Sequence, residues 1–284
     1  MISRLRTYAS FVRISHSVFA LPFALAGAVL AARHAPPTWA TVGWILVAMV
    51  GARSAAMGFN RLVDARTDAL NPRTARRELP TGAMSQPEAT AFVVVSSLLF
   101  VFAASQLNRT CLILAPIALG IVFWYSLAKR YTTWTQLFLG LAMAVAPVGG
   151  WLAVGGGAGW EPWLLALAIG TWVGGFDVLY ACQDLEFDRA HDLHSIPVRF
   201  GVRGSLAISR AMHVTTIVCL LALALVTPLG PVYFAGVLIV AGLLAYEQSL
   251  VSADDLSQVK RAFDLNGYVG ILYLLVLVVS IYGR

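Results

Sequence analysis

The sequence predicts an all-α membrane protein built as a bundle of nine transmembrane helices. Of the 284 residues, 59% are hydrophobic and 12% are charged, and that charged share is about half of what an ordinary soluble domain contains. The mean hydropathy is +0.77, and the apolar residues gather in long stretches. A soluble protein of this length could not bury so much apolar surface, so a lipid bilayer is the expected solvent.

Each predicted helix corresponds to an apolar stretch close to the roughly 20 residues that a hydrocarbon core of about 30 Å requires. The first stretch lacks a convincing cleavage site and is followed by further stretches, so we expect a retained helix and no cleaved signal peptide. No separate soluble region is indicated, and residues 1–284 are expected to form one intramembrane domain. The nine stretches are 15–33, 39–62, 89–106, 111–128, 133–153, 162–183, 211–227, 231–251 and 264–282.

The positions of the basic residues predict the orientation of the bundle. Lys and Arg precede the first stretch and follow the second, fourth, sixth and eighth, whereas the opposite side receives Arg33, Arg109 and Arg284. By the positive-inside rule, the N-terminus is cytoplasmic and the C-terminus lies outside. The formal charge of +6 is therefore a topology signal and gives no reason to expect a nucleic-acid partner. We expect a multi-pass protein of the cell inner (plasma) membrane, in contact with membrane lipid, whose active site faces the cytoplasm.

The segment GFNRLVDARTD, residues 58–68, places polar side chains at the cytoplasmic end of the second stretch. Asn60, Asp64 and Asp68 follow one another at steps of four residues, and four residues advance an α-helix by one turn plus about 40°. Their oxygen atoms would therefore lie along one helix face. Polar residues often accumulate where a helix leaves the membrane, but three oxygen ligands on one face favour a binding site.

A second acidic cluster lies at the cytoplasmic end of the sixth stretch. Asp184, Asp188 and Asp192 repeat the four-residue step. Two groups of carboxylates on one side of a bundle repel each other unless cations lie between them. Hard oxygen ligands favour Mg²⁺ or Ca²⁺ over zinc or copper, so the two clusters together predict a divalent-cation site.

Basic residues near both clusters favour a phosphorylated substrate. Mg²⁺ commonly binds through one or two carboxylates plus phosphate oxygens, and arginine suits forked contacts with phosphate, while lysine supplies a point charge. In an apolar bundle, this combination suits a pyrophosphate with a long lipid tail. Metal-assisted loss of pyrophosphate from an allylic tail would leave a carbocation for an electron-rich ring to attack. The residues expected to bind pyrophosphate are Arg66, Arg73, Arg77, Lys129 and Arg130.

The motifs resemble those of the UbiA-type intramembrane prenyltransferases over nearly the whole chain. The N-x-x-x-D-x-x-x-D pattern of residues 60–68, the D-x-x-x-D pattern of residues 184–188, and the segments NPRTARRELPTG, YSLAKRYT and APVGGWLAV carry the resemblance. It implies Mg²⁺-dependent transfer of a polyprenyl group from polyprenyl pyrophosphate to a carbon of an aromatic ring in quinone biosynthesis.

The resemblance also assigns roles to residues. Asp192 stands where relatives usually carry glycine, so we leave it outside the core site. The implied metal ligands are Asn60, Asp64, Asp68, Asp184 and Asp188. The residues expected to be catalytic are Asp64, Asp184, Arg66 and Lys129.

Two aromatic acceptors fit the flanking segments. RISHSVFALPFAL, NPRTARRELP and YACQDLEFDR resemble both the 4-hydroxybenzoate polyprenyltransferases of ubiquinone synthesis and the enzymes of the futalosine route to menaquinone. The acceptor of the second group is a dihydroxynaphthoate. The wording of the motifs favours the menaquinone group, with 4-hydroxybenzoate as the alternative.

Four residues are expected to contact the acceptor, whose carboxylate favours a cationic partner. Arg53 lies seven residues before Asn60 on a similar helix face, and an intramembrane charge is costly and usually functional. Its alternative role is a salt bridge to Asp177 or to the acidic motifs. The others are His16, which could equally pack between helices, Asp177 and Tyr180.

A transporter is the non-enzyme alternative, because intramembrane Asp and Arg residues often mark ion or solute paths. The two acidic motifs lie four helices apart in parallel orientation, which indicates a pseudo-repeat without the inverted symmetry of a transporter. Other lipid transferases of the same fold, such as those making haem O or chlorophyll, form a third class.

Overall fold

The computed structural model describes residues 7–283, except residues 9 and 13 and the side chains of residues 14–19. The described residues form helices and contain no β-strand, so the predicted all-α fold is confirmed, and each of the nine predicted stretches coincides with a long helix. These helices are α2 (Ile14–Ala31), α3 (Trp39–Leu70), α4 (Gln86–Leu107), α5 (Arg109–Ala128), α6 (Thr135–Ala153), α7 (Glu161–Ala181), α9 (Ile196–Val226), α10 (Gly230–Ser249) and α11 (Val259–Tyr282).

Eight helices in the described part of the chain are long and apolar enough to cross a membrane, and Ala20–Ala31 of α2 is a shorter apolar helix. Local sequence explains several helix ends. Ser85 and Glu88 form a capping box at the start of α4, and Asn108 both ends α4 and caps α5. These side chains satisfy backbone N–H groups that have no partner within the helix.

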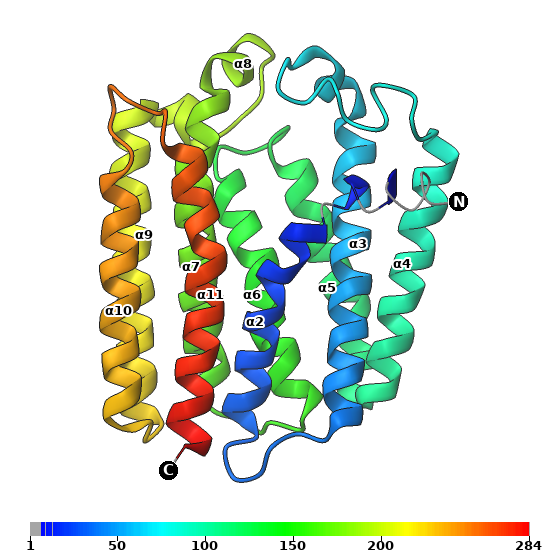
Figure 1. The fold of residues 1–284 in the computed structure, drawn as a ribbon. Coiled ribbons are helices and arrows are strands. Elements are labelled where there is room, and N and C mark those ends of the chain that lie inside the picture. The colour runs from blue at the N-terminus through cyan, green and yellow to red at the C-terminus, as the bar shows by residue number, and fades with distance from the viewer. Residues whose placement is uncertain (1–6, 9, 13, 284) are drawn as a thin grey trace.

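The long helices run roughly side by side, with α2 and α6 near the middle of the bundle (Figure 1). Small residues allow α2 and α6 to pack closely. A Cβ atom on Gly27 would overlap the carbonyl group of Pro147, and one on Gly150 would overlap that of Ala24. Close backbone approach at small residues is the usual way in which membrane helices associate.

The connections 71–85, 129–134, 182–195 and 250–258 gather at the end of the bundle opposite the C-terminus (Figure 1). Two helices at this end differ in length from the prediction. Helix α3 continues to Leu70, so the first acidic motif lies wholly within it. Helix α9 begins at Ile196, well before the predicted residue 211, because its first turns carry basic residues that lower the hydropathy of the segment.

The second acidic motif lies on an interrupted helix. Helix α7 ends at Ala181, a 3₁₀ turn spans Cys182–Asp184, and the short α8 covers Leu185–Ala190. Its acids therefore do not share the face of one regular helix. The four-residue spacing is the same in a continuous and in an interrupted helix, so it could not reveal the break.

Candidate active site

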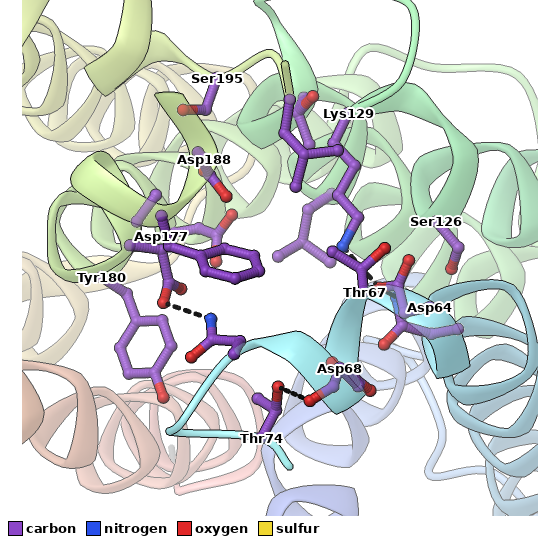
Figure 2. Close-up of a pocket in the computed structure, with 18 of the residues that line it drawn as sticks. Asp64, Thr67, Asp68, Thr74, Ser126, Lys129, Asp177, Tyr180, Asp188 and Ser195 are labelled. Atoms are coloured by element: carbon purple, nitrogen blue, oxygen red, sulfur yellow. Dashed lines mark hydrogen bonds and ion pairs between the residues drawn. The ribbon is translucent and has the colours of Figure 1, made fainter. Parts of the chain in front are cut away.

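A polar pocket of about 240 Å³ opens at the loop-bearing end of the bundle, between α3, α5, α6, α7 and α8. Figure 2 shows Asp64 and Asp68 on one wall and Asp177 and Asp188 on the facing wall. The structure thus brings the two acidic motifs, which are far apart in the sequence, to one cavity. Its lining also includes the basic side chains of Arg73, Arg77 and Lys129.

The first motif is held by the uninterrupted helix α3. Asp64 is 3% exposed and Asp68 is 6% exposed. The Nζ atom of Lys129 donates to Oδ2 of Asp64 at 2.7 Å, and Arg130 donates to Oδ1 at 3.0 Å. Nη1 of Arg77 lies 2.8 and 2.7 Å from the two carboxylate oxygens of Asp68. Both buried carboxylates are therefore paired with cations from neighbouring loops, as buried charges require.

The second motif is held largely by the loop that follows α3. Nε of Arg73 donates to Oδ1 of Asp184 at 3.0 Å, its Nη2 donates to Oδ2, and its Nη1 donates to the Tyr180 hydroxyl at 3.1 Å. Burial alone would lower the pKa of Arg73, but the charge of Asp184 and the hydrogen bonds to it outweigh burial and raise it. Asp188 has Asp184 and Lys129 in its electrostatic environment and is hydrogen-bonded to Ser195.

Asn71 joins the two motifs and was not among the predicted site residues. Its backbone N–H ends α3 by donating to the carbonyl of Thr67. Its side-chain oxygen accepts from the backbone N–H of Arg73 at 2.9 Å, and its Nδ2 lies 3.4 Å from Oδ1 of Asp184. An Asn-Pro pair directly after a long helix is a recognisable stop signal, although this signal does not disclose the contact with Asp184.

Hydrogen bonds connect the two loops at the pocket rim, which follow α5 and α8. The backbone N–H of His194 donates to the carbonyl of Lys129 at 2.8 Å, and the backbone N–H of Ile196 donates to the Gln136 side chain at 3.1 Å. Ser195 caps α9 through the N–H of Val198. These contacts fix the segment after α8 against the segment that carries Lys129.

The donor set of the pocket fits a divalent cation that arrives with phosphate. Within the described residues, no group of three or more His, Cys, Asp and Glu lies close enough to hold a metal ion. Mg²⁺ commonly keeps several waters and uses one or two carboxylates together with substrate phosphate oxygens. Carboxylates on two facing walls, together with the basic side chains that line the same cavity, match that mode better than a protein-only metal cage.

The structure gathers most of the predicted site residues and leaves a few outside. Arg130 contacts Asp64 without lining the cavity, and Arg66 is exposed on α3 outside it. Arg53 also lies outside the lining, but it belongs to the electrostatic environment of Tyr125, which lines the pocket. The side chain of His16 lies outside the described residues. The predicted residues that line the pocket are Asn60, Asp64, Asp68, Arg73, Arg77, Lys129, Asp177, Tyr180, Asp184 and Asp188.

Asp192 follows α8 in an exposed position with φ 53° and is absent from the pocket lining. Several lining residues carried no recognisable signal in the sequence. Gln136 and Phe187 come from α6 and α8. They are ordinary residues of membrane helices and helix ends, and only the packing of these helices reveals that they face the cavity.

The fold and the pocket together define a helical membrane protein with an acidic and basic site at one end of its bundle. The model of the UbiA prenyltransferase family matches residues 20–275. The chain therefore belongs to the UbiA prenyltransferase family and is a transferase. The predicted family and enzyme class are confirmed, and the transporter alternative is set aside.

Named relatives of this chain act on one of the two acceptors considered above. It is 31% identical over 245 residues to a 4-hydroxybenzoate octaprenyltransferase of Citrobacter koseri, with 84% of each chain covered. It is 28% identical over 253 residues to a protein of the same name from Vibrio campbellii, with 89% of each chain covered. These names favour the alternative acceptor, 4-hydroxybenzoate, and give no support to dihydroxynaphthoate.

Solved structures agree with the fold. The apo structure of a UbiA homolog from Aeropyrum pernix K1 has a TM-score of 0.86 and 36% sequence identity, covering 94% of this chain and 98% of the homolog. A UbiA homolog from Archaeoglobus fulgidus bound to GPP and Mg²⁺ has a TM-score of 0.74 and 20% identity, covering 96% and 99%. At the lower identity, the likeness concerns the fold alone.

Proposed function

We propose that this enzyme transfers a polyprenyl group from its pyrophosphate to a ring carbon of 4-hydroxybenzoate, as a step of ubiquinone synthesis, with Mg²⁺ as the metal. The observation that carries the proposal is that both acidic motifs and three cationic side chains line one pocket. The names of the relatives support the choice of acceptor. The excess of basic residues at the pocket end supports a cytoplasmic active site in the inner membrane.

The pyrophosphate end of the substrate would lie between the two motifs. Asn60, Asp64, Asp68, Asp184 and Asp188 would hold Mg²⁺, which supplies charge neutralisation for the departing pyrophosphate. Arg73, Arg77 and Lys129 already line this volume and would bind the phosphate oxygens. Arg130 would support Lys129 by holding Asp64 in place, and Arg66, which is exposed, would contribute from the periphery.

Transfer proceeds by breaking the allylic C–O bond, whose electron pair leaves with pyrophosphate. The allylic carbon, now electron-deficient, is attacked by a ring carbon of the acceptor, and a proton then leaves that ring carbon. Lys129, Arg73 and Arg77 would stabilise the charge that develops on the leaving group, because fixed cations act strongly in a pocket with little water. The aromatic lining residues Tyr180 and Phe187 would shelter the allylic cation.

The acceptor would lie at the inner end of the pocket, near the membrane. Asp177 and Tyr125 line the pocket from within α7 and α5, and Arg53 lies in the electrostatic environment of the Tyr125 hydroxyl. Arg53 would attract the acceptor carboxylate, while Asp177 and Tyr180 would orient the ring hydroxyl. His16 belongs to the same proposed acceptor set.

A two-acceptor assay on the detergent-purified chain tests the proposal. Geranyl pyrophosphate and Mg²⁺ are supplied with either 4-hydroxybenzoate or 1,4-dihydroxy-6-naphthoate, and EDTA serves as the control. The expected result is EDTA-sensitive prenylation of 4-hydroxybenzoate with release of pyrophosphate. Prenylation of the naphthoate alone would instead assign the enzyme to menaquinone synthesis, and release of no pyrophosphate with either ring would contradict both assignments.

A further inference from the structure

Cationic side chains that line the pocket already pair with most of its motif carboxylates. Three of the motif carboxylates each have a cationic partner from another segment: Asp64 with Lys129, Asp68 with Arg77, and Asp184 with Arg73. Building on the function proposed above, we propose that these three cations exclude a free divalent cation and yield the carboxylates only to one that arrives with pyrophosphate. The site would thus select the metal–pyrophosphate complex over either component.

The first step of the argument concerns Asp64, whose two oxygens are both engaged. Oδ2 accepts from Lys129 at 2.7 Å and from Asn60 at 3.3 Å, and Oδ1 accepts from Arg130 at 3.0 Å. A Mg²⁺ ligand needs a carboxylate lone pair at about 2.0–2.1 Å. Oδ2 has two lone pairs and both are engaged, so a cation can take this oxygen only if Lys129 withdraws. Figure 2 shows the Lys129 amine directed at this carboxylate.

The same holds on both walls of the pocket. One nitrogen of Arg77 spans the two oxygens of Asp68, and the fork of Arg73 covers the two oxygens of Asp184. A free divalent cation that displaced one of these side chains would leave it without its anion and close to a new double positive charge. Like charges in a partly buried site repel strongly, so this exchange is unfavourable.

Pyrophosphate removes that obstacle because it offers new anionic partners. Lys129, Arg73 and Arg77 can turn from carboxylate to phosphate oxygens while the metal takes the freed carboxylates. Pyrophosphate without metal meets the converse problem, since it would face carboxylates that have lost their cations. Each component should therefore raise the affinity for the other, and linkage requires that the two effects be equal.

Lys129→Gln is the decisive variant, because it should raise the affinity for a metal ion alone and lower the affinity for a metal ion with pyrophosphate. It removes a cation from Asp64 but leaves Arg130 on the same carboxylate, so the buried charge keeps a partner. In the purified full chain, binding of Mn²⁺ alone, followed by the free-Mn²⁺ electron paramagnetic resonance signal, should tighten about tenfold. Binding of Mn²⁺ with inorganic pyrophosphate should weaken by a similar factor, because one phosphate partner is lost.

Two matched variants complete the experiment. Arg76→Gln removes the same charge from an exposed neighbour that does not line the pocket, and both affinities should stay at the wild-type values. Lys129→Arg keeps a cation and should keep the weak binding of Mn²⁺ alone. Equal thermal unfolding of all four proteins would establish that the differences arise in the folded pocket.

The inference is overturned if Lys129→Gln leaves the affinity for Mn²⁺ alone unchanged or weakens it, or if Lys129→Arg tightens it as much as Lys129→Gln. It is also overturned if the wild-type protein binds Mn²⁺ equally well with and without pyrophosphate. If any of these contradicting results were found while the wild-type protein showed normal prenyl transfer, the proposed function would stand and this inference alone would fall. Absence of both pyrophosphate binding and prenyl transfer in the wild-type protein would remove the proposed function itself.

Discussion

The two acidic motifs have the same spacing in the sequence but different supports in the fold. Asp64 and Asp68 lie within an uninterrupted helix of 32 residues and are nearly fully buried. Asp184 and Asp188 lie on either side of the junction between a 3₁₀ turn and a helix of six residues, and the Asp184 side chain is 19% exposed. The first motif is positioned by its own helix, whereas the second depends on contacts from elsewhere.

Those contacts come mainly from the segment that follows the first motif. Asn71 and Arg73 reach across the pocket to Asp184, while Ser195 holds Asp188 from the other side. The loop after α3 therefore builds part of both walls. A change in this loop should therefore disturb the second motif more than the first.

The largest effect is expected at the helix-borne motif. Asp64→Ala would remove a proposed metal ligand and leave Lys129 and Arg130 without their carboxylate. We expect prenyl transfer to fall by at least about 10³-fold and the free energy of unfolding to fall by about 3 kcal/mol, the usual cost of breaking a buried pair. Initial rates and thermal unfolding measure the two effects. As a control, Asp192→Asn changes an exposed position outside the pocket and should keep activity within about twofold of the wild type. A folded and active Asp64→Ala protein would contradict the assignment of Asp64 as a metal ligand.

The two loop arginines should respond differently to replacement by lysine. Arg73 uses three nitrogens on Asp184 and Tyr180, a fork that lysine cannot reproduce, so Arg73→Lys should lower kcat/KM for the prenyl pyrophosphate by about tenfold or more. Arg77 uses one nitrogen on both oxygens of Asp68, a contact open to a lysine amine. Arg77→Lys should therefore cost about threefold. Steady-state assays measure both variants. An equal loss of kcat/KM in the two would show that the forked contact of Arg73 does not contribute to function.

Asn71 offers a smaller and more selective change. Asn71→Ala removes the side-chain bonds to the Arg73 backbone and to Asp184 but leaves the acidic residues and their cations in place. We expect a loss of about 1–2 kcal/mol in substrate binding, seen as a higher KM for the prenyl pyrophosphate with little change in kcat. A changed kcat with an unchanged KM would show that Asn71 does not act by positioning Asp184 and Arg73 for binding.

The contrast between the motifs also explains what the sequence could and could not predict. The long helices and the face shared by Asn60, Asp64 and Asp68 follow from local hydropathy and helical period, so both were predictable. The break at Cys182–Asp184 was not, because the four-residue step fits either backbone. Arg77 pairs with Asp68 and Arg73 with Asp184 because of the path that the 71–85 loop takes. This loop has no regular helix or strand, so its sequence does not predict which acid each arginine reaches.

The smallest effect is expected at Arg66, which lies between the motif acids in the sequence but on the exposed side of α3. Residues 64 and 66 are about 200° apart around a helix, since each residue turns it by about 100°. The Arg66 side chain would therefore have to wrap around the helix to reach a phosphate that Asp64 faces.

We expect Arg66→Gln to change kcat/KM by less than about threefold, mainly through a lower association rate at low ionic strength, as a peripheral charge does. Stopped-flow binding of the prenyl pyrophosphate at two salt concentrations tests this. A loss as large as that of Arg73→Lys, persisting at high salt, would place Arg66 in direct contact with the substrate and require the loop end of α3 to rotate or unwind on binding.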